Sequence, residues 1–156
     1  KIEKKIEDVQ KEIKITAEYI KSSVERIEST NHYILNRIFI MLHEEPVAIF
    51  ESDKDGEYIW VNNTFMKMCG KPFTELNGNG WLNSIHPKFR DSVRKEWLLA
   101  VKEDRSFDMT YSLIGISGEI IPVHTKTYPM IDKHGEVSGH MGFVRKLSGV
   151  LPELIN

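Results

Sequence analysis

Isoleucine recurs at every seventh position in the first part of this chain of 156 residues. The repeat runs through Ile6, Ile13, Ile20, Ile27 and Ile34, and Met41 continues it. Such a repeat puts one continuous apolar stripe on a slightly under-wound helix, so the stripe faces a partner helix along its whole length. The period ends at Glu45 and Pro46. The sequence therefore predicts a long helix or coiled coil over residues 1–45, followed by a separate globular domain.

The companion stripe of a regular coiled coil is incomplete. Ile2 and Val9 begin it, but Thr16, Ser23, Thr30 and Arg37 follow at the same spacing, while apolar residues move by one place to Ala17, Val24 and Ile38. This shifted pattern predicts that the paired helices change register at low cost. The β-branched residues at the repeating core position favour a coiled coil of two helices. The expected dimer interface consists of Ile6, Val9, Ile13, Ile20, Val24, Ile27, Ile34, Ile38 and Met41. The alternative is one amphipathic helix packed on its own domain.

Charge and cysteine content exclude several classes of protein. A net charge of −2, with lysines interleaved among glutamates, offers no basic surface for nucleic acid. The single cysteine, Cys69, cannot form an internal disulfide and suits a reducing compartment, so we expect a cytoplasmic protein. No apolar run approaches the roughly 18 residues that a membrane span needs. Because the chain begins at Lys1, we expect the natural protein to continue upstream, with an effector or a membrane segment there left open.

The remaining residues alternate between strand and helix patterns. Strands are expected at 47–51, 57–61, 107–114, 120–130 and 137–147, with a capped short helix at 62–70 and a longer helix from Pro87 to about Glu103. Asp55-Gly56 marks the first hairpin. This order predicts an α+β domain, in which one five-stranded antiparallel sheet carries its helices on one face. We expect the long helix or a second subunit to cover the other face, because the apolar side chains of Ile59, Val61 and Val144 would otherwise be exposed to solvent.

The motifs of this region resemble those of PAS domains, in the branch with a tryptophan and His-Pro signature. They are Asp53-x-Asp55-Gly56, Trp60-Val61-Asn62-x-x-Phe65, Gly70, Trp81-x-x-x-Ile85-His86-Pro87-x-x-Arg90, Gly118-Glu119 and Asp132-x-x-Gly135-Glu136-Val137-x-Gly139-x-x-Gly142-Phe143-Val144-Arg145. The resemblance covers residues 46–147 and leaves 148–156 as a tail. It implies a sheet around a small internal pocket, used to sense ligands or to pass signals between subunits through flanking helices.

The residues favour no catalytic or metal-binding chemistry. The helix from Lys88 to Glu103 has no histidine for haem, and the cysteine segment of a flavin photosensor of this family is missing. His86 is expected to fix the loop by hydrogen bonding or to cap the helix that follows it. His124 and His140 lie on predicted strands where they would meet across the sheet, but without a nearby cysteine or carboxylate cluster they form a poor zinc site. We therefore expect that the chain is not an enzyme and that it binds no metal, haem or flavin. Binding of an unidentified small molecule is left as an alternative.

The candidate ligand pocket is defined by large apolar residues and a few polar ones. It comprises Phe50, Phe65, Met66, Phe73, Trp81, Asn83, Trp97, Tyr111, Thr125, Met141 and Phe143, with Leu82 and Thr127 near them. A domain of this size needs as many large residues to fill its core, so composition alone does not show a void. Two hypotheses follow. The chain is a bacterial-type signalling module that dimerises through its N-terminal helix and relays a ligand- or partner-induced change, or it is a ligand-free docking and dimerisation protein.

Overall fold

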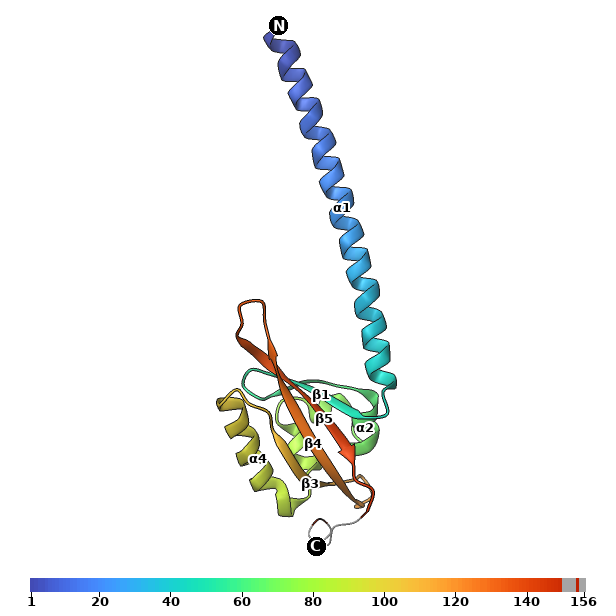
Figure 1. The fold of residues 1–156 in the computed structure, drawn as a ribbon. Helices are drawn as coiled ribbons and strands as arrows, with labels where there is room; N and C mark the ends of the chain where they lie inside the picture. The colour runs from blue at the N-terminus through green and yellow to red at the C-terminus, as the bar shows by residue number, and fades with distance from the viewer. Residues whose placement is uncertain (150–153, 155–156) are drawn as a thin grey trace. The chain divides into compact units, whose positions relative to one another are not determined.

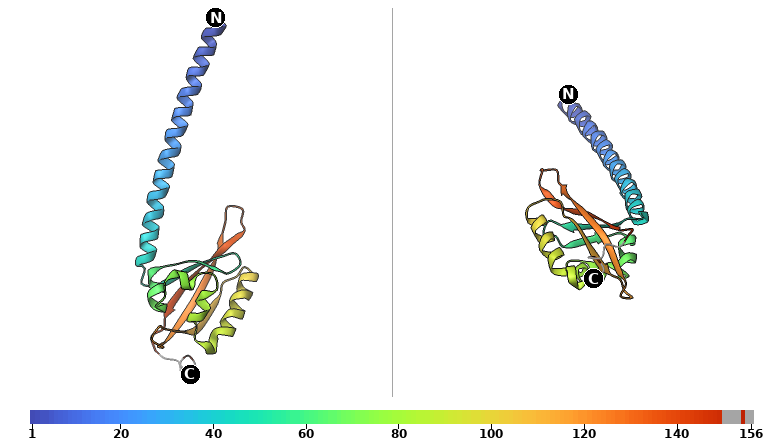
Figure 2. Two further views of the ribbon diagram at one scale, coloured as in Figure 1. Left: turned by 180° about the vertical axis from the view of Figure 1, so that it is seen from behind. Right: turned by 60° about the horizontal axis from the view of Figure 1, so that its bottom comes forward.

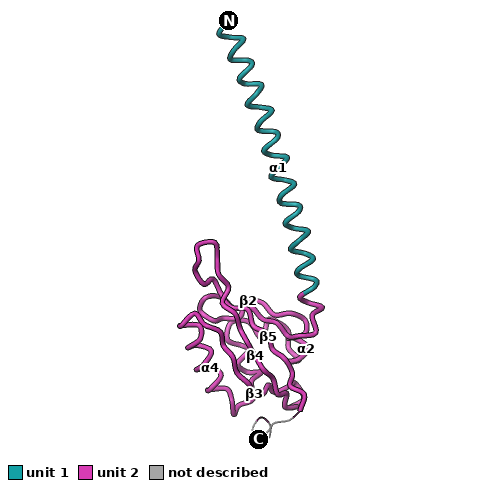
Figure 3. The backbone as a smooth tube through the Cα atoms, in the orientation of Figure 1, with its two compact units in different colours: residues 1–41 teal, residues 42–156 magenta. Residues whose placement is uncertain are grey.

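The computed structural model describes residues 1–149 and residue 154. The chain divides into two compact units, Lys1–Met41 and Leu42–Asn156, which are coloured separately in Figure 3. The first unit contains most of one long helix, and the second contains the sheet and the remaining helices. The boundary between the units lies within the helix, so its last residues belong to the globular unit.

Helix α1 spans Ile2–Glu44. Residues 1–45 contain neither proline nor glycine, and isoleucine, lysine and glutamate dominate, so nothing interrupts the helix. It ends before Pro46, because a proline disfavours helical geometry in the residue that precedes it. At 1.5 Å per residue the helix is about 65 Å long. All of α1 is described, and none of its side chains is buried within a single chain.

Five antiparallel strands form the sheet of the second unit (Figure 1). They are β1 (Ala48–Asp53), β2 (Tyr58–Val61), β3 (Asp108–Ile114), β4 (Ile120–Ile131) and β5 (Val137–Lys146), in the spatial order β2-β1-β5-β4-β3. Between β2 and β3 come α2 (Asn63–Cys69), α3 (Phe73–Leu76), the 3-10 helix η1 (Gly80–Ser84) and α4 (Pro87–Lys102). These helices, green to yellow, lie together on one side of the sheet (Figure 2). The α+β architecture predicted from the sequence is confirmed.

In two hairpins an aspartate side chain holds the turn by accepting hydrogen bonds from the backbone. Asp53 Oδ1 accepts hydrogen bonds from the backbone N–H groups of Asp55 and Glu57, and Asp132 Oδ1 accepts them from His134 and Glu136. A glycine with positive φ completes each turn, at 87° for Gly56. The Gly56 carbonyl also accepts a hydrogen bond of 3.0 Å from Trp97 Nε1, which fixes the β1–β2 turn to helix α4.

Stacked aromatic rings fill the space between the sheet and the helices. Phe50 stacks on Tyr58 with ring centroids 4.2 Å apart, and Tyr58 stacks on Trp81 at 4.7 Å. Trp97 meets Phe50 and Trp81 edge to face at 5.8 and 6.3 Å. The ring of Phe50 lies over Gly142 of β5, where any Cβ atom would collide with it. This contact identifies the face of β5 that carries Gly142 as the core face.

Strand register corrects part of the sequence interpretation. Phe50 pairs with Gly142 and Ala48 with Val144, so Met141 and Phe143 lie on the opposite face, where Phe143 contacts Tyr128. Val61 and Val144 were expected to need a cover on the outer face, but both belong to the core. The prediction assumed that the largest residues of β5 point inward, whereas Phe50 already occupies the space above that strand. Only Ile59 of the three is half exposed.

Candidate functional site

The internal cavity lies among the aromatic rings between the sheet and α4. It is lined by Phe50, Tyr58, Trp81, Val93, Trp97, Phe107, Tyr111 and Thr125. Five of these, Phe50, Trp81, Trp97, Tyr111 and Thr125, were candidates from the sequence. The cavity volume is about 10 Å³, which is close to the lower limit for one water molecule. The side chains therefore nearly fill the space that a ligand would need.

Polar groups beside the cavity are only partly paired. Tyr111 Oη and Thr125 Oγ1 lie 2.8 Å apart and share a hydrogen bond, and burial raises the pKa of Tyr111, so its hydroxyl stays protonated. Trp81 Nε1 is also buried, but it has no hydrogen-bond partner among the residues that the structure describes. A buried donor without a partner costs roughly 1–3 kcal/mol. Trp81 thus carries an unpaired buried donor and is one of the residues that line the cavity.

The other candidates lie outside the cavity. Phe65 is buried in the same core, and Met66 and Phe73 pack against that core half-buried, whereas the side chain of Asn83 is exposed. Asn83 belongs to η1, whose neighbouring residues Trp81 and Ser84 are the ones that turn inward. Met141 and Phe143 are excluded by the strand register. Thr127 is buried and accepts a hydrogen bond from the Phe107 backbone N–H at 2.8 Å, which leaves its hydroxyl oxygen occupied.

Sequence reasoning missed Tyr58, Val93 and Phe107 as cavity residues. Each had been assigned to the correct element, but contact across the core depends on how β2, α4 and β3 pack together. Val93 and Trp97 are four residues apart on α4 and therefore share one face of that helix. That spacing was the available signal for Val93. Tyr58, the first residue of β2, and Phe107, the residue before β3, have no comparable local signal.

His140 is the other titratable side chain inside the domain. It is fully buried on β5, its ring meets Trp97 edge to face at 5.6 Å, and neither ring nitrogen has a hydrogen-bond partner among the described residues. Burial lowers its pKa, and the negative charge of Asp104 opposes this effect. His124 does not meet it, because His124 Nε2 lies 2.6 Å from Asp108 Oδ1 on the other face. His86 Nδ1 accepts from Lys88 N–H at the start of α4, as predicted.

Asn62 connects three elements through its carboxamide. Its Oδ1 accepts hydrogen bonds from the backbone N–H of Ile49 at 2.9 Å and of Phe65 at 3.0 Å. Its Nδ2 donates to the carbonyls of Leu42 and Val47, each at 2.9 Å. The side chain is fully buried. One residue therefore holds the last turn of α1, the linker that follows it, strand β1 and the first turn of α2.

The two residues after Asn62 hold the same linker. Asn63 N–H donates to His43 Nδ1 at 3.0 Å, and Thr64 Oγ1 donates to the carbonyl of Glu45. The ring of His43 also meets Trp60 edge to face at 5.3 Å. We call residues 42–47 together with residues 62–64 the helix joint. All of them belong to the second unit, so the joint is a feature of the globular part of the chain.

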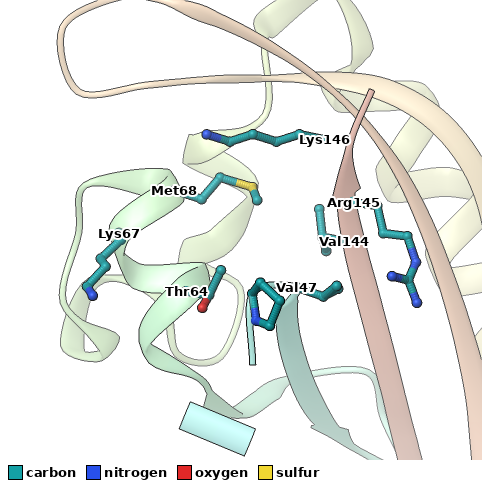
Figure 4. A pocket seen from close by; sticks show the side chains of 8 residues that line it. Val47, Thr64, Lys67, Met68, Val144, Arg145 and Lys146 are labelled. Carbon is teal, nitrogen blue, oxygen red and sulfur yellow. The ribbon is translucent and has the colours of Figure 1, made fainter. Parts of the chain in front are cut away.

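A larger hollow opens beside the joint, between α2 and the end of β5 (Figure 4). Its volume is about 550 Å³ and it is lined by Pro46, Val47, Thr64, Lys67, Met68, Val144, Arg145 and Lys146. We call it the basic groove. The side chain of Lys146 extends across it toward Met68 and Lys67 lies on the α2 side, while the Arg145 side chain points away from the groove on the other side of β5 (Figure 4).

Reactive groups are scarce in the described part of the chain. No cluster of three or more histidine, cysteine, aspartate or glutamate side chains suited to a metal ion occurs there. Burial raises the pKa of the Cys69 thiol to about 11, so its nucleophilic thiolate form is rare at neutral pH. Among the same residues, no helix combines the length and the apolar character needed to cross a bilayer.

Comparison with known proteins decides the family. A sequence model of the PAS fold matches residues 42–150, which is most of the chain. The chain belongs to the PAS family. The matched range begins at Leu42, within the helix joint. PAS domains are typically sensory modules rather than catalysts. No curated protein matches the chain.

Solved structures share the fold at low sequence identity. A PAS domain from Colwellia psychrerythraea has a TM-score of 0.60 and 19% identity, over 73% of this chain and 97% of that one. The PAS domain of an HTR-like protein from Haloarcula marismortui gives 0.63 and 15%, over 79% and 99%. The N-terminal domain of a diguanylate cyclase with a PAS/PAC sensor, from Marinobacter aquaeolei, gives 0.57 and 14%, over 64% and 94%. At these identities the similarity concerns the fold alone.

Proposed function

We propose that this chain is a cytoplasmic PAS module of a signal-transduction protein, which forms homodimers through α1 and relays a conformational change between its PAS domain and that helix. The observation that carries the proposal is the helix joint, in which the buried Asn62 bonds α1, β1 and α2 at once. The single cysteine, free and buried, suits the reducing cytoplasm.

The apolar stripe of α1 supports the dimer. Ile13 and Ile27 are 63% and 60% exposed in a single chain, and the other isoleucines of the repeat are also exposed. Burying one such side chain stabilises a complex by about 1.5–3 kcal/mol. A second α1 offers the same stripe, since a two-fold dimer brings identical surfaces together. Homodimerisation therefore removes the largest exposed apolar surface of this helix.

The relay follows from the four hydrogen bonds of Asn62. If α2 or β1 moves, the Asn62 carboxamide has to move with it or lose a bond, and either change alters the support of the Leu42 carbonyl in the last turn of α1. The slipped stripe at Thr16, Ser23 and Thr30 lowers the cost of a change in helix register. Two arrangements of the helices then become accessible, and the PAS domain biases the choice between them.

The nearly filled cavity favours an input other than a large cofactor. Small-molecule sites usually measure about 300–1,000 Å³, whereas the cavity has about 10 Å³. We therefore propose that the domain works without haem or flavin and that a partner protein supplies the signal. The same observation favours a second candidate function, a ligand-free PAS domain that serves only for docking and dimerisation.

Native mass spectrometry of the freshly purified chain tests the absence of a cofactor. The expected spectrum contains only the mass of the polypeptide, alone or in multiples. An additional mass that is retained under gentle conditions and lost on unfolding would contradict this part of the proposal. It would also identify the Trp81 N–H as the first group to examine for ligand contact.

The relay is tested by the distance between spin labels on two α1 helices. A cysteine introduced at Ser22, near the middle of α1, serves for parallel and for antiparallel pairing, and the native Cys69 is buried and protonated. We expect Asn62→Ala to shift or broaden the distance distribution. Asn63→Ala is the matched control, because only the backbone of Asn63 takes part in the joint. Identical distributions for wild type and Asn62→Ala would show that the joint does not control the helices and would leave the docking function.

A further inference from the structure

The basic groove differs in charge from the rest of the chain. Its lining includes Lys67 from α2 and Lys146 from β5 and no carboxylate, whereas Arg145 belongs to the lining with its side chain directed to the opposite face of β5. Within the described residues, none of the three makes an ion pair, since the ion pairs there involve Arg105 and His124. The chain as a whole carries a net charge of −2. Basic residues gathered around one groove of a weakly acidic protein indicate a binding site for a negatively charged partner.

The floor of the groove is apolar. Val144 is buried, Val47 and Met68 are half-buried, and Pro46 closes the end next to the helix joint. Methionine adapts to different shapes, which suits a surface that receives a partner side chain. The hollow of about 550 Å³ is large enough for one or two such side chains. The groove therefore combines an apolar anchor site with one lysine from α2 and one from β5.

We infer that the basic groove binds an acidic segment of a partner protein, with an apolar side chain on Val47, Met68 and Val144 and carboxylates beside Lys67 and Lys146. Charge complementarity selects this occupant, because two lysines without ion-pair partners favour an anionic chain and reject a basic one. Nucleic acid is a poorer fit, since base stacking needs exposed aromatic rings, and the groove lining contains none.

The position of the groove links docking to the helix joint. Pro46 and Val47 line the groove and also belong to the joint, and Thr64 lines it while donating a hydrogen bond to Glu45. An occupant of the groove therefore contacts the residues that hold the end of α1. This consequence rests on the proposed relay, whereas docking itself does not. Binding and helix geometry are consequently measured in separate experiments.

The binding test uses the full chain and a fluorescent peptide in which one leucine is flanked by glutamates on both sides. Fluorescence anisotropy is expected to show binding that weakens with added salt. The double variant Lys67→Glu with Lys146→Glu should lower the affinity at least about tenfold. The matched control, Lys95→Glu with Lys102→Glu, makes the same charge change at exposed positions of α4 and should leave the affinity unchanged. Circular dichroism of each double variant checks that the substitutions leave the fold intact.

Amide chemical shifts of the labelled chain locate the peptide. We expect shifts at Val47, Thr64, Met68 and Lys146. No binding tighter than about 1 mM, shifts elsewhere on the domain, or equal affinity of the two double variants would overturn the inference. Stronger binding to phosphatidylserine vesicles than to the peptide would also overturn it, because the groove would then select a lipid surface. A peptide that binds in the groove without changing the spin-label distances would support docking and contradict the relay alone.

Discussion

At the scale of single residues, Asn62 uses every hydrogen-bonding position that its buried side chain offers to the backbone around it. Removing the carboxamide leaves two partly buried carbonyls and two buried N–H groups to find other partners. We expect Asn62→Ala to lower the free energy of unfolding by about 2–4 kcal/mol. Urea denaturation followed by the fluorescence of the buried Trp81 and Trp97 measures this loss. Asn63→Ala, whose side chain makes no such bonds, should cost less than about 1 kcal/mol, and equal losses would refute the assigned role.

His140 makes the stability of the domain depend on pH. Burial lowers its pKa below the ordinary value of 6.5, so the unfolded chain takes up the proton more readily than the folded one. The contribution of neutral His140 is complete above that ordinary value and is lost as the pH falls below it, by at most about 1.4 kcal/mol per pH unit.

Urea titrations at pH values above and below 6.5 compare the free energy of unfolding of wild type with that of His140→Gln. We expect the substitution to reduce the slope of stability against pH, while His134→Gln, at an exposed turn position, should leave it unchanged. An unaltered slope in His140→Gln would mean that other groups cause the acid sensitivity.

Gly142 determines which face of β5 points into the core. A methyl group there collides with the Phe50 ring, so Gly142→Ala should destabilise the domain by roughly 1–3 kcal/mol. Phe50→Leu removes the obstacle, and the double variant should therefore lose less than the sum of the two single changes. A urea-denaturation double-mutant cycle measures this coupling, and strictly additive losses would contradict the contact.

The same residue explains an error of sequence reasoning. Met141 and Phe143 have the apolar character expected of core residues, and alternation alone does not say which of two sets faces inward. Gly142 and the buried His140 form the inward set because the large Phe50 ring comes from the neighbouring strand. A single strand does not contain this information, since the fit depends on two strands together.

At the scale of elements, local signals predicted the structure well. The absence of proline and glycine before Pro46 placed the end of α1 within a residue or two, Pro87 marked the start of α4, and Asp55-Gly56 marked the first hairpin. The short helices α3 and η1 have no periodic signal in the sequence, and the residues beside them bridge to β2 at Gly78 and to β3 at Ile85. The joint escaped prediction since its bonds connect residues about 20 positions apart.

The polar positions of the α1 stripe should limit the stability of the coiled coil. Replacing Thr16, Ser23 and Thr30 with leucine extends the second apolar stripe as far as residue 30, so we expect the melting temperature of the helix to rise by roughly 10 °C. Circular dichroism follows the melting. Leucine at Ser22 and Ser29, which lie off the stripe, is the control and should change little. Equal effects of the two sets would mean that these positions do not face a partner helix.

At the scale of the whole molecule, the chain combines a long helix whose apolar stripe is exposed in a single chain and a PAS domain that folds around its own core. The sequence was sufficient to predict the family and both parts. It was insufficient to predict how full the cavity is, because five of the proposed residues do line it but Tyr58, Val93 and Phe107 complete the packing. Whether a core retains a void depends on the fit of all these side chains at once.

Homodimerisation through α1 is the central claim, and sedimentation equilibrium tests it most directly. The chain at micromolar concentration should sediment with twice its mass of 18.1 kDa. Ile13→Lys with Ile34→Lys should give monomers, while Ile15→Lys with Leu35→Lys, at similarly exposed positions off the stripe, should remain dimeric. A wild-type chain that sediments as a single 18.1 kDa species at high micromolar concentration would contradict the account.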